Sequence, residues 1–188
     1  MRSEIIADHA KDGWRLERLT LASHSGSHVD APLHKFAGAA SLDEIPLDRW
    51  LGNAWIADLR NAKSDERFTA ERLEQRLPEN LNDAIVLLAT GWGDRRGKTD
   101  LWLHHAPLLC RQSAQWLVER GVRGVGIDYY SVGDAETHQE LLAAGIWIAE
   151  DLRFPPEVFQ LKQPVQFWCL PINLKGHSGA FCRPVIVA

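Results

Sequence analysis

Three histidines and an aspartate lie close together near the start of the chain. Residues 23–34 read SHSGSHVDAPLH, so His24, His28, Asp30 and His34 fall within eleven residues. In an extended backbone every second side chain points to the same side, which places these four on one face. Imidazole nitrogens and carboxylate oxygens are the ligands that divalent transition metals use in proteins. The segment therefore predicts a metal site, against the alternative of histidines that pack or face solvent around a turn.

This segment must bend if its histidines are to share one metal ion. Fully extended, His24 and His28 would lie roughly 13 Å apart at ~3.3 Å per residue, whereas each zinc–nitrogen distance is ~2.0–2.1 Å. Gly26 can adopt the positive φ of a sharp bend, and Pro32 excludes a regular helix through the second half. We expect a bent segment that follows the end of a strand.

Two more residues of the ligand type lie far along the chain. His138 falls at the start of a predicted helix, and Glu150 at the end of the strand that follows it. A compact fold can bring such element ends to one edge of a sheet. The pair by itself is a weak signal, because a histidine in a helix and a glutamate at a strand end are common without a metal.

The hydrophobic pattern predicts a mixed α/β fold. Residues 84–89 form a continuous apolar run, typical of a central strand buried on both faces. Thr69 is expected to cap a helix that Pro78 ends, and Thr137 to cap a helix that Gly145 ends. Because helices separate the middle strands while strands flank both ends, the class is mixed α/β and not a uniform doubly wound sheet. Further strands are expected at 17–23, 53–59, 122–127, 146–150, 165–170, 171–174 and 181–187, helices at 114–120 and 138–144, and a short helix or turn at 42–50.

Length and composition bound the class of protein. At 188 residues the chain is long enough for one well-buried core, and we expect a single domain over residues 1–188. The net charge of −4 gives no electrostatic footprint for nucleic acid or an anionic membrane, so the expected partner is a small molecule or a protein. The sequence has neither an apolar run long enough to span a membrane nor a signal-peptide pattern, which predicts a cytoplasmic location.

Other patterns are weaker candidates for chemistry. The loop 91–99 follows a strand and ends Gly-Lys-Thr, but Trp92 stands where a phosphate-binding loop needs its first glycine, which favours a solvated basic turn. The three cysteines fit neither a zinc ribbon nor a thioredoxin motif, and we expect them to pack as small hydrophobes. The neighbours His104 and His105 point apart, so we expect no ion shared between them.

The segment 24–34 resembles a known signature. It matches the His-x-Gly-Thr-His-x-Asp-x-Pro-x-His pattern of the cyclase family of metal-dependent hydrolases, which includes bacterial kynurenine formamidase and isatin hydrolase. Ser27 stands where the family usually has threonine, and because the hydroxyl is kept we expect the local hydrogen bonding to survive. The resemblance continues through residues 90–92, 124–128, 138–150 and 170–187, and so covers nearly the whole chain.

This resemblance implies a fold, a metal site and an activity. The implied fold is a swivelling β/β/α domain with a mixed sheet, and the implied activity is hydrolysis of a small amide or lactam, of an arylformamidase-like kind. Two divalent ions, zinc or manganese, would share Asp30 as a bridging ligand, with His34 as the catalytic acid/base. Relatives suggest a homodimer or a homotetramer. The implied metal ligands are His24, His28, Asp30, His138 and Glu150.

Several roles stay open at this point. Trp92 and Asp128 are candidate substrate-binding residues, although Asp128 could instead pair with Arg183 and hold loops near the site. His177, on a glycine-rich loop, either contacts the substrate or faces solvent.

Two further functions remain as alternatives. Only 23 residues precede His24, whereas family members usually carry a longer leader, so we expect part of the pocket wall to be absent or to come from a partner subunit. One alternative is accordingly a metal-binding sensor of the same fold without turnover. The other, less favoured, is a non-haem iron oxygenase whose two-histidine-one-carboxylate triad is His28, Asp30 and His138.

Overall fold

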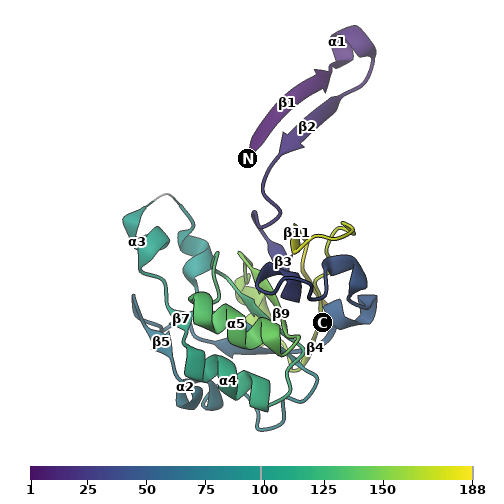
Figure 1. Ribbon diagram of the computed structural model, residues 1–188. Coiled ribbons are helices and arrows are strands. Elements are labelled where there is room, and N and C mark those ends of the chain that lie inside the picture. The colour runs from purple at the N-terminus through teal and green to yellow at the C-terminus, as the bar shows by residue number, and fades with distance from the viewer. Residues whose placement is uncertain (98, 188) are drawn as a thin grey trace.

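An eight-stranded mixed sheet forms the body of the protein in the computed structural model, which describes residues 1–97 and 99–187 (Figure 1). The strands lie in the order β11-β3-β9-β8-β6-β4-β10-β12. This arrangement confirms the predicted mixed α/β class. The strands are β3 (His28–Asp30), β4 (Leu51–Asp58), β6 (Ile85–Ala89), β8 (Gly124–Ile127), β9 (Trp147–Glu150), β10 (Val165–Trp168), β11 (Gly179–Phe181) and β12 (Val185–Val187).

The centre of the sheet is parallel and its flanks are antiparallel. β4, β6, β8 and β9 run parallel to their neighbours in this group, and β6 is buried along its whole length, as its apolar run predicted. β3 and β11 are added antiparallel on one side, and β10 and β12 on the other. A parallel strand needs a crossover, which accounts for the helices between the middle strands.

Helices cover one face of this sheet, as Figure 1 shows for α4 and α5. The strands β5 (Arg67–Phe68) and β7 (Leu108–Leu109) form a separate two-stranded parallel sheet beside this layer of helices. The opposite face is closed by irregular chain, with Trp50, Phe154 and Phe167 in its core. None of the helices in the described residues is long and apolar enough to cross a membrane. The helices of the body are α2 (Ala70–Glu74), α3 (Asp100–His104), α4 (Arg111–Glu119) and α5 (Ala135–Ala143), with 3-10 turns at Pro32–His34, Leu42–Glu44, Leu47–Trp50, Trp92–Arg95 and Pro156–Gln160.

The start of α5 differs from the prediction. The capping residue is Asp134 and not Thr137, because the Asp134 carboxylate accepts a hydrogen bond from the Thr137 backbone N–H at 2.9 Å and another from the Thr137 hydroxyl at 2.9 Å. An aspartate at this position also interacts favourably with the helix dipole. The helix therefore begins at Ala135, and His138 lies one turn inside it, on the buried side. Thr69 does cap α2, as expected.

The predicted strand at 171–174 is wrong. Only Pro171 takes part in pairing, through an isolated bridge to Cys182. Proline has no backbone N–H to offer a ladder, which limits regular pairing there. Lys98, part of the predicted basic turn, and Ala188, the last residue of the expected domain, lie outside the described residues.

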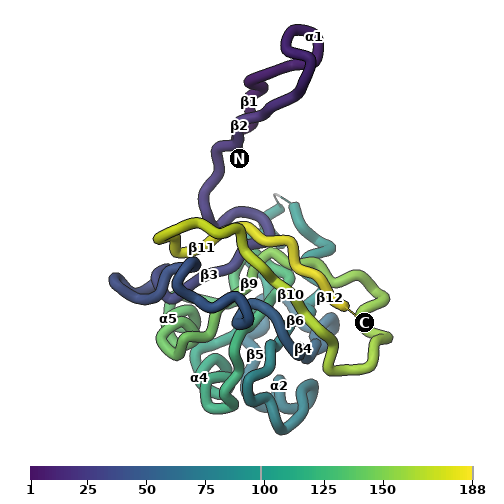
Figure 2. Tube along the Cα trace, turned by 90° about the vertical axis from the view of Figure 1, so that its right-hand side faces the viewer, coloured from purple at the N-terminus to yellow at the C-terminus, as the bar shows by residue number. Residues whose placement is uncertain are grey.

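The first twenty residues form a hairpin that stands away from the body (Figures 1 and 2). It consists of β1 (Arg2–Ala7), the short helix α1 (His9–Asp12) and β2 (Leu16–Thr20). The strand predicted at 17–23 overlaps β2 but ends at Thr20, so residues 21–27 separate it from β3. β1 has no counterpart among the strands expected from the sequence.

Candidate metal centre

The centre is built on β3, the strand next to the edge of the sheet. β3 pairs antiparallel with β9, and this register places His28 directly opposite Glu150. Directly opposed residues of an antiparallel pair project from the same face. The His28 Nε2 atom consequently lies 3.4 Å from a Glu150 oxygen and 3.4 Å from an Asp30 oxygen.

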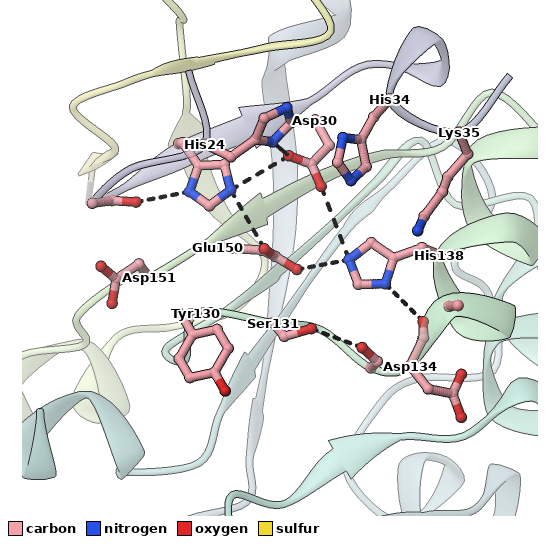
Figure 3. A pocket seen from close by; sticks show the side chains of 14 residues that line it. His24, Asp30, His34, Lys35, Tyr130, Ser131, Asp134, His138, Glu150 and Asp151 are labelled. Atoms are coloured by element: carbon pink, nitrogen blue, oxygen red, sulfur yellow. Dashed lines mark hydrogen bonds and ion pairs between the residues drawn. The ribbon is translucent and has the colours of Figure 1, made fainter. Parts of the chain in front are cut away.

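His138 reaches the same point from α5. Its Nε2 atom lies 3.1 Å from Glu150 Oε1 and 4.0 Å from Asp30 Oδ2 (Figure 3). Its Nδ1 atom lies 2.8 Å from the Asp134 carbonyl oxygen, just as the Nδ1 atom of His28 lies 2.7 Å from the carbonyl oxygen of Gly26. When the Nδ1–H group donates a hydrogen bond to a backbone carbonyl, the lone pair of Nε2 is the one that can bind a metal ion. This arrangement is typical of histidines that bind metals.

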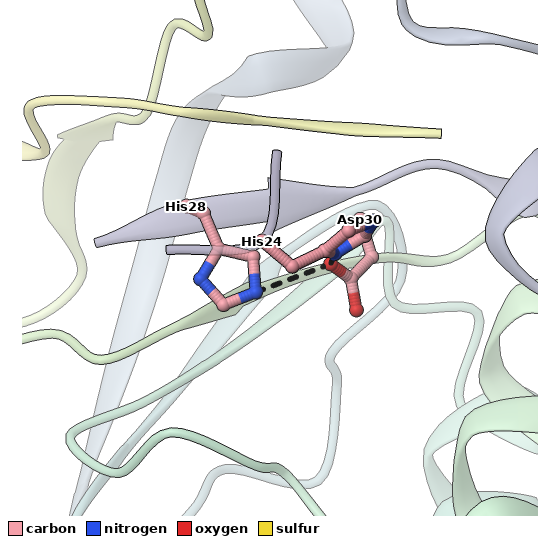
Figure 4. Close-up of side chains that lie close together, drawn as sticks. All are labelled: His24, His28 and Asp30. Atoms are coloured by element: carbon pink, nitrogen blue, oxygen red, sulfur yellow. Dashed lines mark hydrogen bonds and ion pairs between the residues drawn. The ribbon is translucent and has the colours of Figure 1, made fainter. Parts of the chain in front are cut away.

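His24 joins the cluster because the chain bends before β3. Gly26 has φ of 60°, the left-handed conformation that the predicted bend needs. The His24 Nδ1 atom lies 2.6 Å from Asp30 Oδ1 (Figure 4). Its Nε2 atom lies 3.1 Å from the Ser178 hydroxyl. The ring packs on Gly179, where a Cβ atom would overlap it.

Ser27 uses its hydroxyl as expected. The side chain donates a hydrogen bond to the Asp151 carbonyl oxygen at 2.7 Å, which ties the approach to β3 to the residue after Glu150. Serine therefore supplies the hydroxyl that threonine gives in the signature.

The five predicted ligands form two overlapping groups. His24, His28 and Asp30 offer one ligand atom each within 4.8 Å of one another, and so do Asp30, His138 and Glu150. Asp30 belongs to both groups, as a bridging carboxylate would. The role of these residues as ligands stays a prediction, but the structure brings all five together from β3, α5, β9 and the preceding loop.

The donor set fits a divalent cation. Asp30 is 1% exposed and Glu150 4% exposed, and burying two carboxylates side by side is costly unless positive charge compensates them. Nitrogen and oxygen donors without thiolates suit zinc or manganese. These residues could therefore hold a cation with their charge neutralised and their outer N–H groups already satisfied.

In the metal-free protein, a proton on His28 supplies part of that charge. Burial alone would lower the pKa of His28, but its hydrogen bond to Glu150 and the charge of Asp30 outweigh burial and raise the pKa to about 9. Burial would raise the pKa of Glu150, but hydrogen bonds from His138 and His28 outweigh it and lower the pKa. Without metal the cluster is thus an ion-pair network in which protonated His28 offsets the charge of the carboxylates.

Metal binding is accordingly expected to release protons. His28 is protonated below its pKa of about 9 in the metal-free protein and must lose its proton to become a ligand. At pH 7 we expect at least one proton released per chain, and affinity that rises about tenfold per pH unit for each proton displaced. Calorimetric titration of metal into the apoprotein in two buffers of different ionisation enthalpy measures the proton count. Identical heats in both buffers would contradict this protonation state.

His34 lies at the rim of the cluster and in neither group of ligands. It sits on the 3-10 turn Pro32–His34, with its ring centroid 4.2 Å from that of His24 and 6.2 Å from that of His138. Burial lowers the pKa of His34, and the neighbouring His24, Lys35 and His138 lower it further against the opposing charge of Asp30. The ring is therefore neutral at pH 7 and can accept a proton.

A cavity of about 570 Å³ opens in front of these residues. Lys35, Tyr130, Ser131 and Asp134 line it together with the predicted ligands and His34 (Figure 3). Lys35 brings a positive charge to the cavity, and it has no ion-pair partner among the residues that the structure describes. None of these four lining residues was among the site residues expected from the sequence. Of these four residues, only Lys35 could have been suspected from the sequence, because it directly follows the predicted catalytic residue His34.

Comparison with known proteins identifies the family of this chain. The Cyclase family model matches residues 3–134 of the chain. The chain belongs to the cyclase family. A kynurenine formamidase from Salinibacter ruber is 31% identical over 180 residues, which cover 91% of this chain and 79% of that protein.

Solved structures of cyclase-family relatives share the fold. Isatin hydrolase A from Labrenzia aggregata is 26% identical with a TM-score of 0.83, over 99% of this chain and 82% of that one. Isatin hydrolase A from Ralstonia solanacearum is 24% identical with a TM-score of 0.84, over 98% of this chain and 80% of that one. At 24% identity this similarity establishes only that the two proteins share a fold.

Two predicted substrate contacts do not reach the cavity of this cyclase-family chain. Asp128 is 2% exposed, and its carboxylate accepts hydrogen bonds from the Thr90 N–H at 2.9 Å, the Thr90 hydroxyl at 2.6 Å and the Gly91 N–H at 2.8 Å. Trp92 is 1% exposed, with the Arg95 guanidinium over its ring. Asp128 therefore holds the loop after β6, and Trp92 packs in the core beneath it.

The remaining candidates also lie elsewhere. Among the described residues Arg183 makes no ion pair with Asp128, and it lines a separate cavity with Phe154 and Val185. His177 is exposed with its Nδ1 atom 2.9 Å from the Lys175 carbonyl oxygen, and His105 pairs with Asp65 at 2.9 Å.

Proposed function

We propose that this chain is a metal-dependent hydrolase of a small amide or lactam, of an arylformamidase-like kind. The observation that carries the proposal is the cluster of three histidines and two carboxylates, all buried except the half-buried His24, with a neutral histidine at its open rim. The names of the similar proteins, kynurenine formamidase and isatin hydrolase, support a reaction at a C–N bond outside a peptide.

The proposed cofactor is a pair of divalent ions, zinc in the first place and manganese as the alternative. His24, His28 and Asp30 would hold one ion, and Asp30, His138 and Glu150 the other. Such ions, when bound, lower the pKa of water to about 7 and polarise a carbonyl group.

The chain's own contribution to the reaction centres on His34. Its neutral imidazole can take the proton that water gives up as the oxygen attacks the carbonyl carbon, and can pass that proton to the leaving nitrogen. The C–N bond breaks, the acyl group keeps the water oxygen, and the nitrogen leaves as an amine. The walls of the cavity, which Tyr130 helps to line, would orient the substrate.

The oxygenase alternative loses support. Its triad would use His28, Asp30 and His138, but Glu150 and His24 lie within the same cluster and add two donors. The all-β barrel typical of such enzymes also differs from this helix-covered sheet.

Metal-dependent hydrolysis tests the proposed function. The purified protein would be stripped with a chelator, reloaded with zinc or manganese, and assayed on formanilide, N-formylkynurenine, isatin and a cyclic imide. We expect turnover of at least one substrate that the chelator abolishes and metal restores. Full metal content without turnover on any of them would instead favour the sensor without catalysis.

Lys35 is expected to favour substrates that carry an anionic group. An ammonium without an ion-pair partner gains a charge-assisted hydrogen bond from a carboxylate on the substrate. Lys35→Gln should raise KM about tenfold for 2-formamidobenzoate, and leave formanilide, which lacks the carboxylate, nearly unchanged. Steady-state kinetics on this matched pair of substrates decides the point. An equal effect on both would show that Lys35 acts on the site and not on the substrate charge.

A further inference from the structure

Two cysteines that the proposed hydrolysis does not use lie in contact with each other. The Sγ atoms of Cys169 and Cys182 lie 3.4 Å apart, and both thiols are free. Cys169 directly follows β10 and is buried, whereas Cys182 directly follows β11 and is half-buried. Packing as a small hydrophobe fits each cysteine singly, as the sequence predicted, but their contact gives them a chemistry that packing does not need.

The pairing of the two segments places both thiols on the same side. Trp168 of β10 lies opposite Val185 of β12, and the antiparallel bridge between Pro171 and Cys182 continues the same register beyond the ends of both strands. Cys169 lies two residues before Pro171, and diagonal neighbours of this kind share a face of an antiparallel pair. A covalent S–S bond is about 2.05 Å long. Small rotations of the two side chains therefore suffice to form one.

We propose that Cys169 and Cys182 are an oxidisable thiol pair that forms a disulfide in the presence of a peroxide. Hydrogen peroxide reaches the half-buried Cys182, whose sulfur attacks one peroxide oxygen. The O–O bond breaks to give a sulfenic acid and water. The Cys169 sulfur then attacks the Cys182 sulfur, the S–O bond breaks, and the hydroxyl leaves with the thiol proton as a second water. Two thiols thus lose two electrons, and one peroxide is reduced to two water molecules.

The disulfide closes the base of a loop that supports the candidate metal centre. Residues 170–181, between the two cysteines, include Ser178 and Gly179. The Ser178 hydroxyl lies 3.1 Å from His24 Nε2, and the His24 ring packs on Gly179. One wall of the position of His24 is therefore built from this loop.

Backbone hydrogen bonds hold this loop against the chain around the predicted ligands. The Ala31 N–H donates to the Ser178 carbonyl oxygen at 2.8 Å, and the Leu42 N–H donates to the His177 carbonyl oxygen at 3.0 Å. In the reduced protein the loop can open when these bonds break, whereas the disulfide keeps its two ends together. Oxidation therefore holds the loop closed over His24. The thiol chemistry itself depends on neither the metal nor the proposed hydrolysis.

The test treats the purified full chain with hydrogen peroxide and then blocks the remaining thiols. Trypsin cuts after Lys175, between the two cysteines, so mass spectrometry should find the peptides with Cys169 and Cys182 joined by a disulfide. Because the crosslink restricts the unfolded chain, the oxidised protein should melt about 5–10 °C higher, and dithiothreitol should reverse this shift. Hydrogen exchange at the Ala31 and Leu42 amides should be slower in the oxidised protein.

Two variants separate this pair from the third cysteine. Cys182→Ser should show neither the crosslink nor the shift in melting temperature. The matched control, Cys110→Ser, should keep both, because the Cys110 thiol donates to the Phe68 carbonyl oxygen at 3.3 Å, away from the pair. The proposal would be overturned by thiols that stay free under peroxide, by a crosslink that joins two chains or includes Cys110, or by an oxidised protein with unchanged melting temperature or unchanged exchange at the two amides.

Discussion

Glu150→Ala is expected to remove one metal ion per chain and to abolish turnover. The carboxylate of Glu150 lies against both His28 and His138, so its loss leaves the second group of ligands with two members. Removing even a residue that only supports a ligand typically costs 10–100-fold in metal affinity, and a ligand itself should cost more than about 100-fold. Elemental analysis of the purified protein measures the stoichiometry, which should fall from two ions to one.

The matched control is Glu157→Ala, which removes an exposed glutamate beyond β9. It should keep two ions and full turnover. If the Glu150 variant kept two ions with wild-type affinity, Glu150 would not be a ligand, and the second site would have to be assigned to other residues.

His34→Ala is expected to lower kcat by about 10²–10⁴-fold while the metal content stays at the wild-type value. The reason is geometric, because His34 stands at the rim of the cluster and belongs to neither group of candidate ligands. Its pKa, lowered by burial, keeps it neutral and ready to accept a proton at pH 7. Parallel measurement of metal content and steady-state rate separates the two roles.

His177→Ala provides the comparison, since His177 is an exposed histidine on a loop outside the cavity. It should change neither measurement. Loss of metal in the His34 variant would make His34 a ligand and would remove the acid/base role from the proposed mechanism.

Local pattern predicts the elements of this fold where burial dominates. The run 84–89 becomes β6 because it is buried on both faces, and the bend at Gly26 follows from the spacing of His24 and His28. β1 escapes prediction because its sequence, Arg-Ser-Glu-Ile-Ile-Ala, does not alternate polar and apolar side chains.

The residues of the candidate site can be predicted from the sequence, but the way in which the fold brings them together cannot. The segment 24–34 and the distant His138 and Glu150 can be named from sequence, but the β3–β9 register that opposes His28 to Glu150 depends on tertiary pairing. Asp128 shows the opposite failure. A carboxylate at a strand end looks available, yet backbone amides of the next loop bind it.

The position of Asp30 between β11 and β9 gives the proposed metal ions a part in the stability of the whole chain. Ligands from residues 24 to 150 meet only after β3, α5 and β9 have assembled, so the unfolded chain holds no comparable site. A ligand that binds only the folded state stabilises it, by ~4 kcal/mol when its concentration is ~1,000 times Kd. Bound metal would thus link His24 to Glu150, which lie more than a hundred residues apart in the chain. Removal of the metal by a chelator should therefore lower the melting temperature as well as the activity.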